Sequence, residues 1–250
     1  MALVIYVDDM IITGNDLEEI ALLQERLSIE FEMKKLGELK YFLDLLAEVG
    51  MLDCKPVDTP IVQNHRLADY PDQVQPNKER YQRLVGKLTY LSHTRPDLAY
   101  TVSVISQFKH APSEDHMNAV ERILRYLKGA PGRELWFRKG PNLEIVGYTD
   151  ADWVGSLQDR RSTSGYFTFL GINLVTWRSK KQKMGELSSA EAEFRGMAKG
   201  LCELLWLKKL MCELWYPSKI EMKLFCDNKA AIDISHNPVQ HNRTKHIKIN

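Results

Sequence analysis

A short apolar segment that runs into an acidic residue constrains this chain more than any other feature. The residues from Leu143 to Tyr148 are mostly apolar and partly β-branched, which is typical of a strand, and Asp150 follows closely. Removing an unpaired carboxylate from water costs on the order of several kcal/mol. Asp150 is therefore expected to remain hydrated, to pair with a cation or to bind a metal ion.

Two acids further along the chain occupy comparable positions. Glu193 lies near the start of an expected helix from about residue 189 to 214, and Asp227 ends a strand-like run that begins at Met222. If the two strand ends and the helix start meet, three carboxylates converge on one point. Such a set of oxygen ligands suits a hard divalent cation.

These residues also have purely structural interpretations. Either Ser188 or Ser189 can serve as the N-cap of the expected helix, and Glu191 is an alternative to Glu193 as the acid of the site. An acid that is not used in the site would still stabilise the helix, because its negative charge lies near the positive N-terminal end of the helix dipole. A lone Asp before a helix, as at position 227, is most often a helix cap.

Several motifs appear in order along the chain: Tyr6-Val7-Asp8-Asp9, Tyr148-Thr-Asp-Ala-Asp-Trp153, Asp159-Arg-Arg-Ser-Thr-Ser-Gly-Tyr166, Ser188-Ser-Ala-Glu-Ala-Glu-Phe194 and Asp227-Asn-Lys-Ala-Ala-Ile232. Together they resemble the Pol polyprotein of copia-type LTR retrotransposons, in which the end of a reverse transcriptase precedes a ribonuclease H domain. The resemblance covers nearly the whole chain. It implies that Asp150, Glu193 and Asp227 are catalytic metal ligands, and it favours Glu193 over Glu191.

The resemblance implies an α/β (α+β) fold in three parts. Residues 1–50 resemble part of a reverse transcriptase palm, residues 51–132 a linker and helical connection region, and residues 133–250 a ribonuclease H-like domain with a mixed sheet. Relatives continue through a further strand to a helix that supplies a fourth Asp. We therefore expect the last domain to lack its C-terminal elements and to leave an apolar sheet face uncovered.

The first part contains an expected hairpin over residues 2–13, with Asp8 and Asp9 at its tip, and an expected helix over residues 16–31. The two acids are either turn residues or, as the resemblance implies, metal ligands of a polymerase centre. Reverse transcriptases hold a further metal-binding Asp before this hairpin. They also insert a primer-gripping strand pair where this sequence passes directly from residue 43 to 44, so we expect no polymerase activity.

In the second part, helices are expected over residues 78–91, from about Asp97, and after Ser113 as N-cap. Basic side chains on these helices form either a solvated polar face or, as the resemblance implies, a surface that follows the backbone of a bound duplex.

In the third part, a strand over residues 135–137 is expected beside the strand that ends at Tyr148, and residues 166–170 and 174–177 are expected to form a hairpin. The polar loop over residues 159–165 is either an ordinary connector or a contact to phosphates. The residues expected to contact nucleic acid are Arg161, Ser162, Ser188, Ser189, Asn228, His241, Arg243 and Lys245.

Composition adds few constraints. The chain has 34 Lys or Arg and 33 Asp or Glu among 250 residues, so net charge gives no indication of a nucleic-acid partner. The four cysteines lack the paired spacing of a zinc site, and reduced thiols are expected in a protein of the cytoplasm, the nucleus or virus-like particles. No apolar run is long enough to span a membrane, so no membrane partner is expected.

The predicted function is hydrolysis of RNA in RNA–DNA hybrids, with two Mg²⁺ ions held by the three carboxylates. The expected partners are the hybrid or another nucleic acid and the remainder of a retroelement polyprotein. Cleavage by this chain is expected to be weak, since the fourth Asp of relatives is missing. Two alternatives remain: a catalytically silent nucleic-acid-binding module, and a degenerate retroelement product without a selected role.

Overall fold

The protein is described by a computed structural model, which describes residues 2–6, 9–13, 16–30, 45–130, 135, 137–138, 140, 142–155, 159–216 and 222–236. The backbone divides into two compact units, Met1–Gly50 and Met51–Asn250. Within the described residues, helices combine with a two-stranded and a four-stranded sheet, which confirms the predicted α/β (α+β) class. The finer boundary at residue 132 stays a prediction.

The first unit contains the predicted hairpin. Strand β1 (Ala2–Tyr6) pairs antiparallel with β2 (Asp9–Thr13), and Tyr6 lies opposite Asp9. Asp8 and the side chain of Asp9 lie outside the described residues. Their role as polymerase metal ligands therefore stays a prediction.

The helix that follows has the predicted cap. Helix α1 (Leu17–Glu30) begins after Asp16, whose carboxylate accepts hydrogen bonds of 3.0 Å from the amides of Glu18 and Glu19. These two amides have no partner within the helix, so the cap satisfies them.

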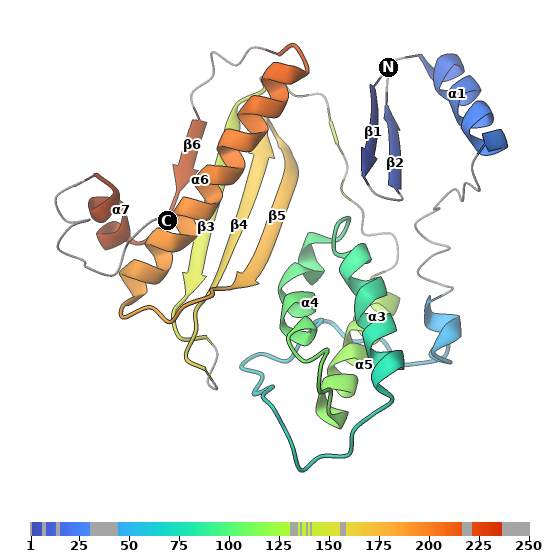
Figure 1. The fold of residues 1–250 in the computed structure, drawn as a ribbon, viewed down its shortest axis with the longest axis vertical. Coiled ribbons are helices and arrows are strands. Elements are labelled where there is room, and N and C mark those ends of the chain that lie inside the picture. The colour runs from blue at the N-terminus through green and yellow to red at the C-terminus, as the bar shows by residue number, and fades with distance from the viewer. Residues whose placement is uncertain are drawn as a thin grey trace. The chain divides into compact units, whose positions relative to one another are not determined.

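The second unit begins with a helical region made of α3 (Lys78–Leu91), the 3₁₀ turn η1 (Pro96–Leu98), α4 (Ala99–Ser106) and α5 (Glu114–Gly129) (Figure 1). The predictions of a helix over residues 78–91 and of another after Ser113 are confirmed. The helix expected from about residue 97 starts at residue 99, after the 3₁₀ turn. No helix in the described ranges is both long and apolar enough to cross a membrane.

The four-stranded sheet consists of β3 (Ile145–Asp152), β4 (Thr163–Leu170), β5 (Asn173–Lys181) and β6 (Met222–Phe225), in the order β5-β4-β3-β6. Strand β3 is antiparallel to β4 and parallel to β6, so the sheet is mixed, as expected for a ribonuclease H-like domain. Helix α6 (Ser189–Glu213) lies along one face, and the short helix α7 (Lys229–His236) follows β6 (Figure 1).

The prediction that residues 135–137 form a strand beside β3 is wrong. Leu135 and Phe137 are not in a strand, because β4 and β6 occupy the two edges of β3. The segment meets the start of β5 instead, where the backbone of Arg138 and the side-chain amide of Asn173 exchange two hydrogen bonds of 2.8 Å. Strand β3 also extends further than predicted, so Asp150 lies within the strand rather than beyond its end.

Small residues allow α6 to lie close to β3. A Cβ at Gly196 would be 3.7 Å from the carbonyl oxygen of Asp150, and Gly200 packs directly against Thr149. Further along the helix, an apolar core forms between α6 and the sheet; its buried residues are Ile145, Leu204, Leu207 and Met211.

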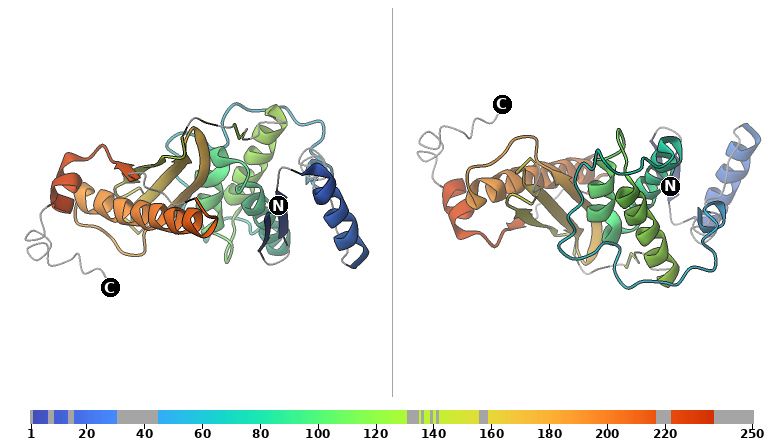
Figure 2. Two further views of the ribbon diagram at one scale, coloured as in Figure 1. Left: turned by 90° about the horizontal axis from the view of Figure 1, so that it is seen from above. Right: turned by 90° about the horizontal axis from the view of Figure 1, so that it is seen from below.

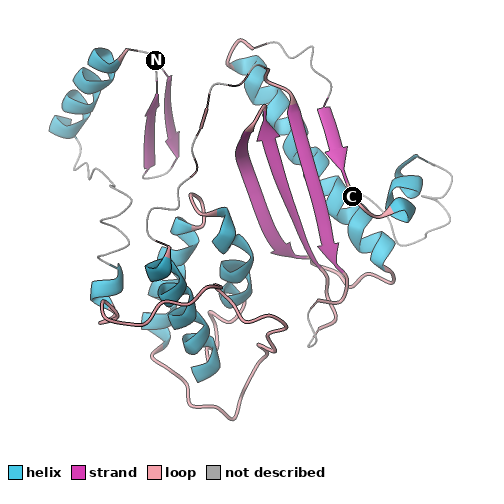
Figure 3. Cartoon of the chain, turned by 180° about the vertical axis from the view of Figure 1, so that it is seen from behind, coloured by secondary structure: helices cyan, strands magenta, loops and turns pink. Residues whose placement is uncertain are grey.

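The other face of the sheet carries a row of aromatic side chains. The strand register sets Trp177, Phe167, Tyr148 and Phe225 next to one another across the four strands. Tyr148 stacks on Phe225 with ring centroids 5.2 Å apart, and Tyr148, Phe167 and Phe225 are each about half exposed. Gly147 and Thr149 of β3 face α6, so Tyr148 between them lies on the other face. Figures 2 and 3 show α6 along one face of the sheet. Within the described residues, this aromatic face is only partly covered.

Candidate acidic metal site

Parallel pairing of β3 and β6 brings the chain segments that carry two acidic residues next to each other. The register pairs Tyr148 with Phe225, the last residue of β6; Asp150 follows two residues later in β3, and Asp227 follows two residues after the end of β6. Neighbouring strands lie about 4.7–4.9 Å apart. The Thr149 hydroxyl donates a hydrogen bond to the Phe225 carbonyl oxygen (3.4 Å), so the two strands remain aligned at this end.

Helix α6 adds Glu193 to these strand ends. Glu193, Gly196 and Gly200 are three and four residues apart and therefore share the helix face that packs on β3. Only 6% of Glu193 is exposed, and its carboxylate accepts a hydrogen bond from the Ala151 amide. Glu193 is thus tied to the residue that directly follows Asp150.

Glu193, Cys226 and Asp227 form a group of potential metal ligands. One ligand atom from each side chain lies within 4.8 Å of the other two. The Cys226 thiol donates a hydrogen bond to Oε2 of Glu193, with sulfur and oxygen 3.7 Å apart. Asp150 is not a member of this group at that spacing. The structure therefore brings two of the three predicted acids close together and sets the third on the adjacent strand.

The electrostatics of the group favour a bound cation. Burial raises the pKa of Glu193, and the carboxylates of Asp150 and Asp227 raise it further, whereas hydrogen bonds from the Ala151 amide and the Cys226 thiol lower it. The pKa of Cys226 is also raised, mainly by burial and then by the nearby acids. A divalent cation would stabilise the ionised form of each group.

Three polar side chains near the acidic group form helix caps or ion pairs of their own. Ser188 is the N-cap of α6 and accepts a hydrogen bond from the Glu191 amide (3.2 Å). Glu191 forms an ion pair with Arg195 at 3.0 Å. Asn228 caps α7, because its Oδ1 accepts a hydrogen bond from the amide three residues on (3.0 Å). The carboxylate of Asp227 is therefore not used as the cap.

The residues predicted to contact nucleic acid differ in exposure. Arg161 is exposed and lies 3.6 Å from Asp159, whereas Ser162 is buried and accepts a hydrogen bond from the Val154 amide (3.3 Å). Of this pair, only Arg161 presents its side chain to solvent. Ser188 and Ser189 are exposed at the start of α6. His241, Arg243 and Lys245, which are also predicted to contact nucleic acid, lie outside the described residues.

Comparison with known proteins identifies the family. No protein-family model matches the chain. It is 39% identical to the retrovirus-related Pol polyprotein from transposon RE2 of Arabidopsis thaliana, over 99% of this chain and 18% of that protein. It is 38% identical to the Pol polyprotein from transposon TNT 1-94 of Nicotiana tabacum, over 99% of this chain and 21% of that protein. An uncharacterized mitochondrial protein of Arabidopsis thaliana is 36% identical over 82% of this chain and 94% of its own length.

This chain belongs to the retrovirus-related Pol polyproteins of transposons. The resemblance indicated by the motifs is thereby confirmed. The chain spans about a fifth of the length of the Pol polyproteins that it matches.

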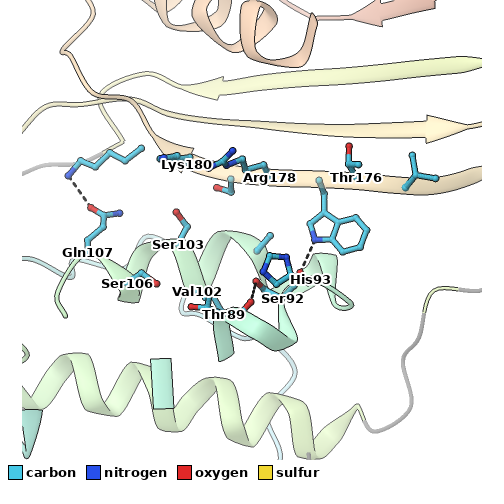
Figure 4. Close-up of a pocket in the computed structure, with 15 residues that line it drawn as sticks. Thr89, Ser92, His93, Val102, Ser103, Ser106, Gln107, Thr176, Arg178 and Lys180 are labelled. Carbon is cyan, nitrogen blue, oxygen red and sulfur yellow. Dashed lines mark hydrogen bonds between the residues drawn. The ribbon is translucent and has the colours of Figure 1, made fainter. Parts of the chain in front are cut away.

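A cleft separates the helical region of this Pol chain from the edge strand β5 (Figure 4). It has a volume of about 540 Å³. Two hydrogen bonds cross it, from Trp177 Nε1 to the Ser92 carbonyl oxygen (2.9 Å) and from Lys181 Nζ to Gln107 Oε1 (3.1 Å). None of the acids described above lines the cleft, so it is distinct from the acidic site.

Cys226 is the member of the site that the sequence analysis missed. No second cysteine lies two to four residues from it, so the paired spacing of a zinc motif is missing and cysteine spacing marks it as an ordinary thiol. The signal that could have found it is its position directly before Asp227, at the end of the strand that carries this acid.

The donor set of the Pol chain fits a divalent cation. Asp150, Glu193 and Asp227 offer the carboxylate oxygens that Mg²⁺ prefers, and Asp150 and Asp227 are exposed enough to share a cation with water or substrate. Cys226 adds a soft sulfur donor of the kind that selects Zn²⁺ over Mg²⁺.

Proposed function

We propose that this chain carries a ribonuclease H site that hydrolyses the RNA strand of RNA–DNA hybrids. The observation that carries the proposal is the meeting of Glu193, from α6, with Asp227, from the end of β6, at ligand atoms within 4.8 Å of each other. Asp150, on the neighbouring strand β3, lies close enough to raise the pKa of Glu193. Membership of the transposon Pol family supports this assignment.

The three carboxylates would hold two Mg²⁺ ions, which supply an activated water and neutralise charge at the scissile phosphate. Backbone contacts within the chain determine the positions of those carboxylates. The Ala151 amide orients Glu193, and the pairing of β3 with β6 supports a position of Asp150 near Asp227. Placement on a helix and two paired strands gives the ligands the rigid support that catalysis requires.

Selectivity for RNA requires contacts to 2′-hydroxyl groups across the shallow minor groove of the hybrid. Arg161 and Ser189 are exposed candidates for such contacts or for contacts to phosphate. Arg161 precedes Thr163, which pairs with Asp152 at the end of β3 that carries Asp150. We further propose that the chain acts with the remainder of a retroelement polyprotein, in the cytoplasm, the nucleus or virus-like particles.

Cleavage of a hybrid that is labelled on its RNA strand, with and without Mg²⁺, tests this function. Asp150→Asn and Asp227→Asn should each lower cleavage by on the order of 10²-fold or more, while binding of the hybrid is retained. Asp152→Asn is a matched control, because it removes an exposed carboxylate from the same strand and should leave cleavage unchanged. Cleavage that persists in Asp150→Asn refutes the proposed site.

A second candidate function is a nucleic-acid-binding module without nuclease activity. It is favoured by the position of Asp150 outside the close group of Glu193, Cys226 and Asp227. In that case the unmodified chain and Asp150→Asn bind the hybrid equally, and neither cleaves it in Mg²⁺. A cooperative thermal transition separates either function from a degenerate product that does not fold.

A further inference from the structure

The outward side of the C-terminal half of α6 exposes large apolar side chains. The inward side of this helix fills the core beneath it, and Figure 1 shows α6 as the layer over that face of the sheet. On the outward side, Leu205 and Trp206 are each about half exposed. Just after the helix, Trp215 is 89% exposed and Tyr216 is more than half exposed. A helix that is apolar on all sides is normally buried on all sides, so this surface has the character of an interface.

The exposed apolar surface is large enough for contact with another protein. An aromatic side chain buries about 150–250 Å² when it is fully covered, so the exposed parts of Trp206, Trp215 and Tyr216 provide about 400 Å². With Cys212 and the aliphatic parts of flanking side chains, one chain provides about 500 Å². Two such surfaces would bury about 1,000 Å², which is the lower end of the range for specific interfaces.

The charged residues on this surface are complementary to a second copy of it. Lys209 Nζ and Glu213 Oε1 lie 3.8 Å apart, and both side chains are more than half exposed. Lys209 lies two residues before Met211 and Glu213 two residues after it, and the Met211 side chain is buried against the sheet.

This symmetry selects an antiparallel arrangement of two helices. If a two-fold axis lies at the level of residue 211, Lys209 of each copy is opposite Glu213 of the partner subunit. Trp206 then lies near the end of the partner's α6, where its Trp215 is exposed. A parallel pair would instead set like charges opposite each other, which is unfavourable.

We propose that two copies of this chain associate through the C-terminal half of α6 as a two-fold symmetric, antiparallel pair. The aromatic side chains form the apolar centre, and two ion pairs between Lys209 and Glu213 fix the direction and the register. Because the interface is small, the dimer is reversible, with a Kd on the order of 10 µM. Glu193 lies about 27 Å earlier along the helix, so the pairing leaves the acidic site free and does not depend on the proposed nuclease.

Sedimentation equilibrium of the full-length chain tests the dimer. The average mass should rise from 28.9 kDa towards twice that value as the concentration increases to about 200 µM. Trp215→Glu introduces a charge at the apolar centre and should weaken association at least about tenfold. Ile172→Glu is the matched control, because Ile172 is an exposed apolar residue in the turn between β4 and β5, and it should leave association unchanged.

The charged pair provides a second test. Lys209→Glu places like charges opposite each other and should also weaken association at least about tenfold. The double variant with Lys209→Glu and Glu213→Lys again has opposite charges at the two positions, so it should recover the association of the unmodified chain.

Two exposed cysteines of α6 test the register. Cys212 is next to the level of the two-fold axis, so its two copies are offset by only about 3 Å along the helices. Cys202 lies further from the axis, and its two copies are about 27 Å apart along the helices. A short bismaleimide reagent should therefore cross-link the unmodified chain and Cys202→Ser, but not Cys212→Ser.

Three results overturn the proposal. A chain that stays monomeric at about 200 µM leaves this surface to another segment of the polyprotein or to a different protein. A dimer that Trp215→Glu and Lys209→Glu leave unchanged, or a cross-link that persists in Cys212→Ser, means that another face pairs. Circular dichroism establishes whether the variants are folded; should Trp215→Glu fail to fold, the loss in Lys209→Glu and its recovery in the double variant decide.

Discussion

Gly200 of α6 lies so close to Thr149 of β3 that no Cβ fits between them. A methyl group at position 200 would collide with Cγ2 of Thr149 and lie 3.2 Å from Cδ1 of Leu224. Thr149 cannot turn aside, because it is buried and β-branched and has few rotamers. The missing side chain therefore sets how closely α6 approaches β3, and with it the position of Glu193 beside the Ala151 amide.

Gly200→Ala should destabilise the chain. Overpacking a closely packed core costs about 1–3 kcal/mol, so the free energy of unfolding and Tm should both fall. Gly86→Ala is the matched control, because Gly86 lies in α3 and a Cβ there would meet nothing within 4 Å. Gly86→Ala should raise the free energy of unfolding by up to about 1 kcal/mol, because Ala has a higher helix propensity than Gly. Equal gains in both variants, measured by thermal unfolding, would contradict the close contact.

The N-terminus of α5 depends on a neutral histidine. His116 is buried and stacks on Phe108 with ring centroids 3.8 Å apart. Its Nδ1 accepts a hydrogen bond from the Ser113 amide (2.9 Å), so Nε2 carries the proton and donates to the Ala68 carbonyl oxygen (3.0 Å). Burial lowers the pKa of His116, against smaller opposing effects of the Ala68 hydrogen bond and two nearby carboxylates.

This lowered pKa predicts acid sensitivity. A histidine in the unfolded chain has a pKa of about 6.5. At pH values between the folded and the unfolded pKa, the unfolded chain therefore binds more protons at this residue than the folded chain does. The stability that neutral His116 contributes is complete above the unfolded pKa and is lost as the pH falls through the folded pKa. Denaturant unfolding across this range should show the loss.

His116→Gln should weaken this pH dependence. His65, whose pKa is also lowered by burial, contributes with the same sign and remains in the variant. The control is His110→Gln, which changes an exposed histidine and should keep the full dependence. Identical pH profiles for His116→Gln and the unmodified chain would exclude His116 as the responsible group.

Local chemistry explains which parts of the fold could be predicted from sequence. Asp16 and Ser113 each precede a helix that they cap, and both caps are formed within a few residues of chain. Pairing between distant segments could not be predicted in the same way: residues 135–137 have the composition of a strand, but β4 and β6 occupy the edges of β3. Likewise, Cys226 meets Glu193 only because β6 pairs with β3 and α6 packs on it, which no local pattern specifies.

Glu193→Gln should stabilise the metal-free chain. Because the pKa of Glu193 is raised in the folded state, its contribution to stability is complete below the unfolded pKa and is lost as the pH rises through the folded pKa. A neutral glutamine still accepts the hydrogen bond from Ala151 but avoids the buried charge. The expected gain near neutral pH is about 1 kcal/mol, measured by denaturant unfolding with a chelator present.

The matched control is Glu191→Gln, two residues earlier in α6. Its carboxylate pairs with Arg195 and accepts a hydrogen bond from the Leu187 amide (3.0 Å), so its neutralisation should cost about 0.5–1 kcal/mol. Added Mg²⁺ should stabilise the unmodified chain but not Glu193→Gln. A loss of stability in both variants would argue against repulsion among the carboxylates.

An indole hydrogen bond joins the helical region to the sheet and predicts the effect of a conservative change. Trp177 of β5 donates from Nε1 to the carbonyl oxygen of Ser92, the C-cap residue of α3 (Figure 4). Trp177→Phe keeps an aromatic ring but removes the donor, so it should cost about 1 kcal/mol. Amide hydrogen exchange should accelerate in β5 and at the end of α3, where this bond holds the two elements together. Trp206→Phe changes an exposed indole on α6 and serves as the control; equal effects of the two variants would mean that the bond to Ser92 contributes nothing to stability.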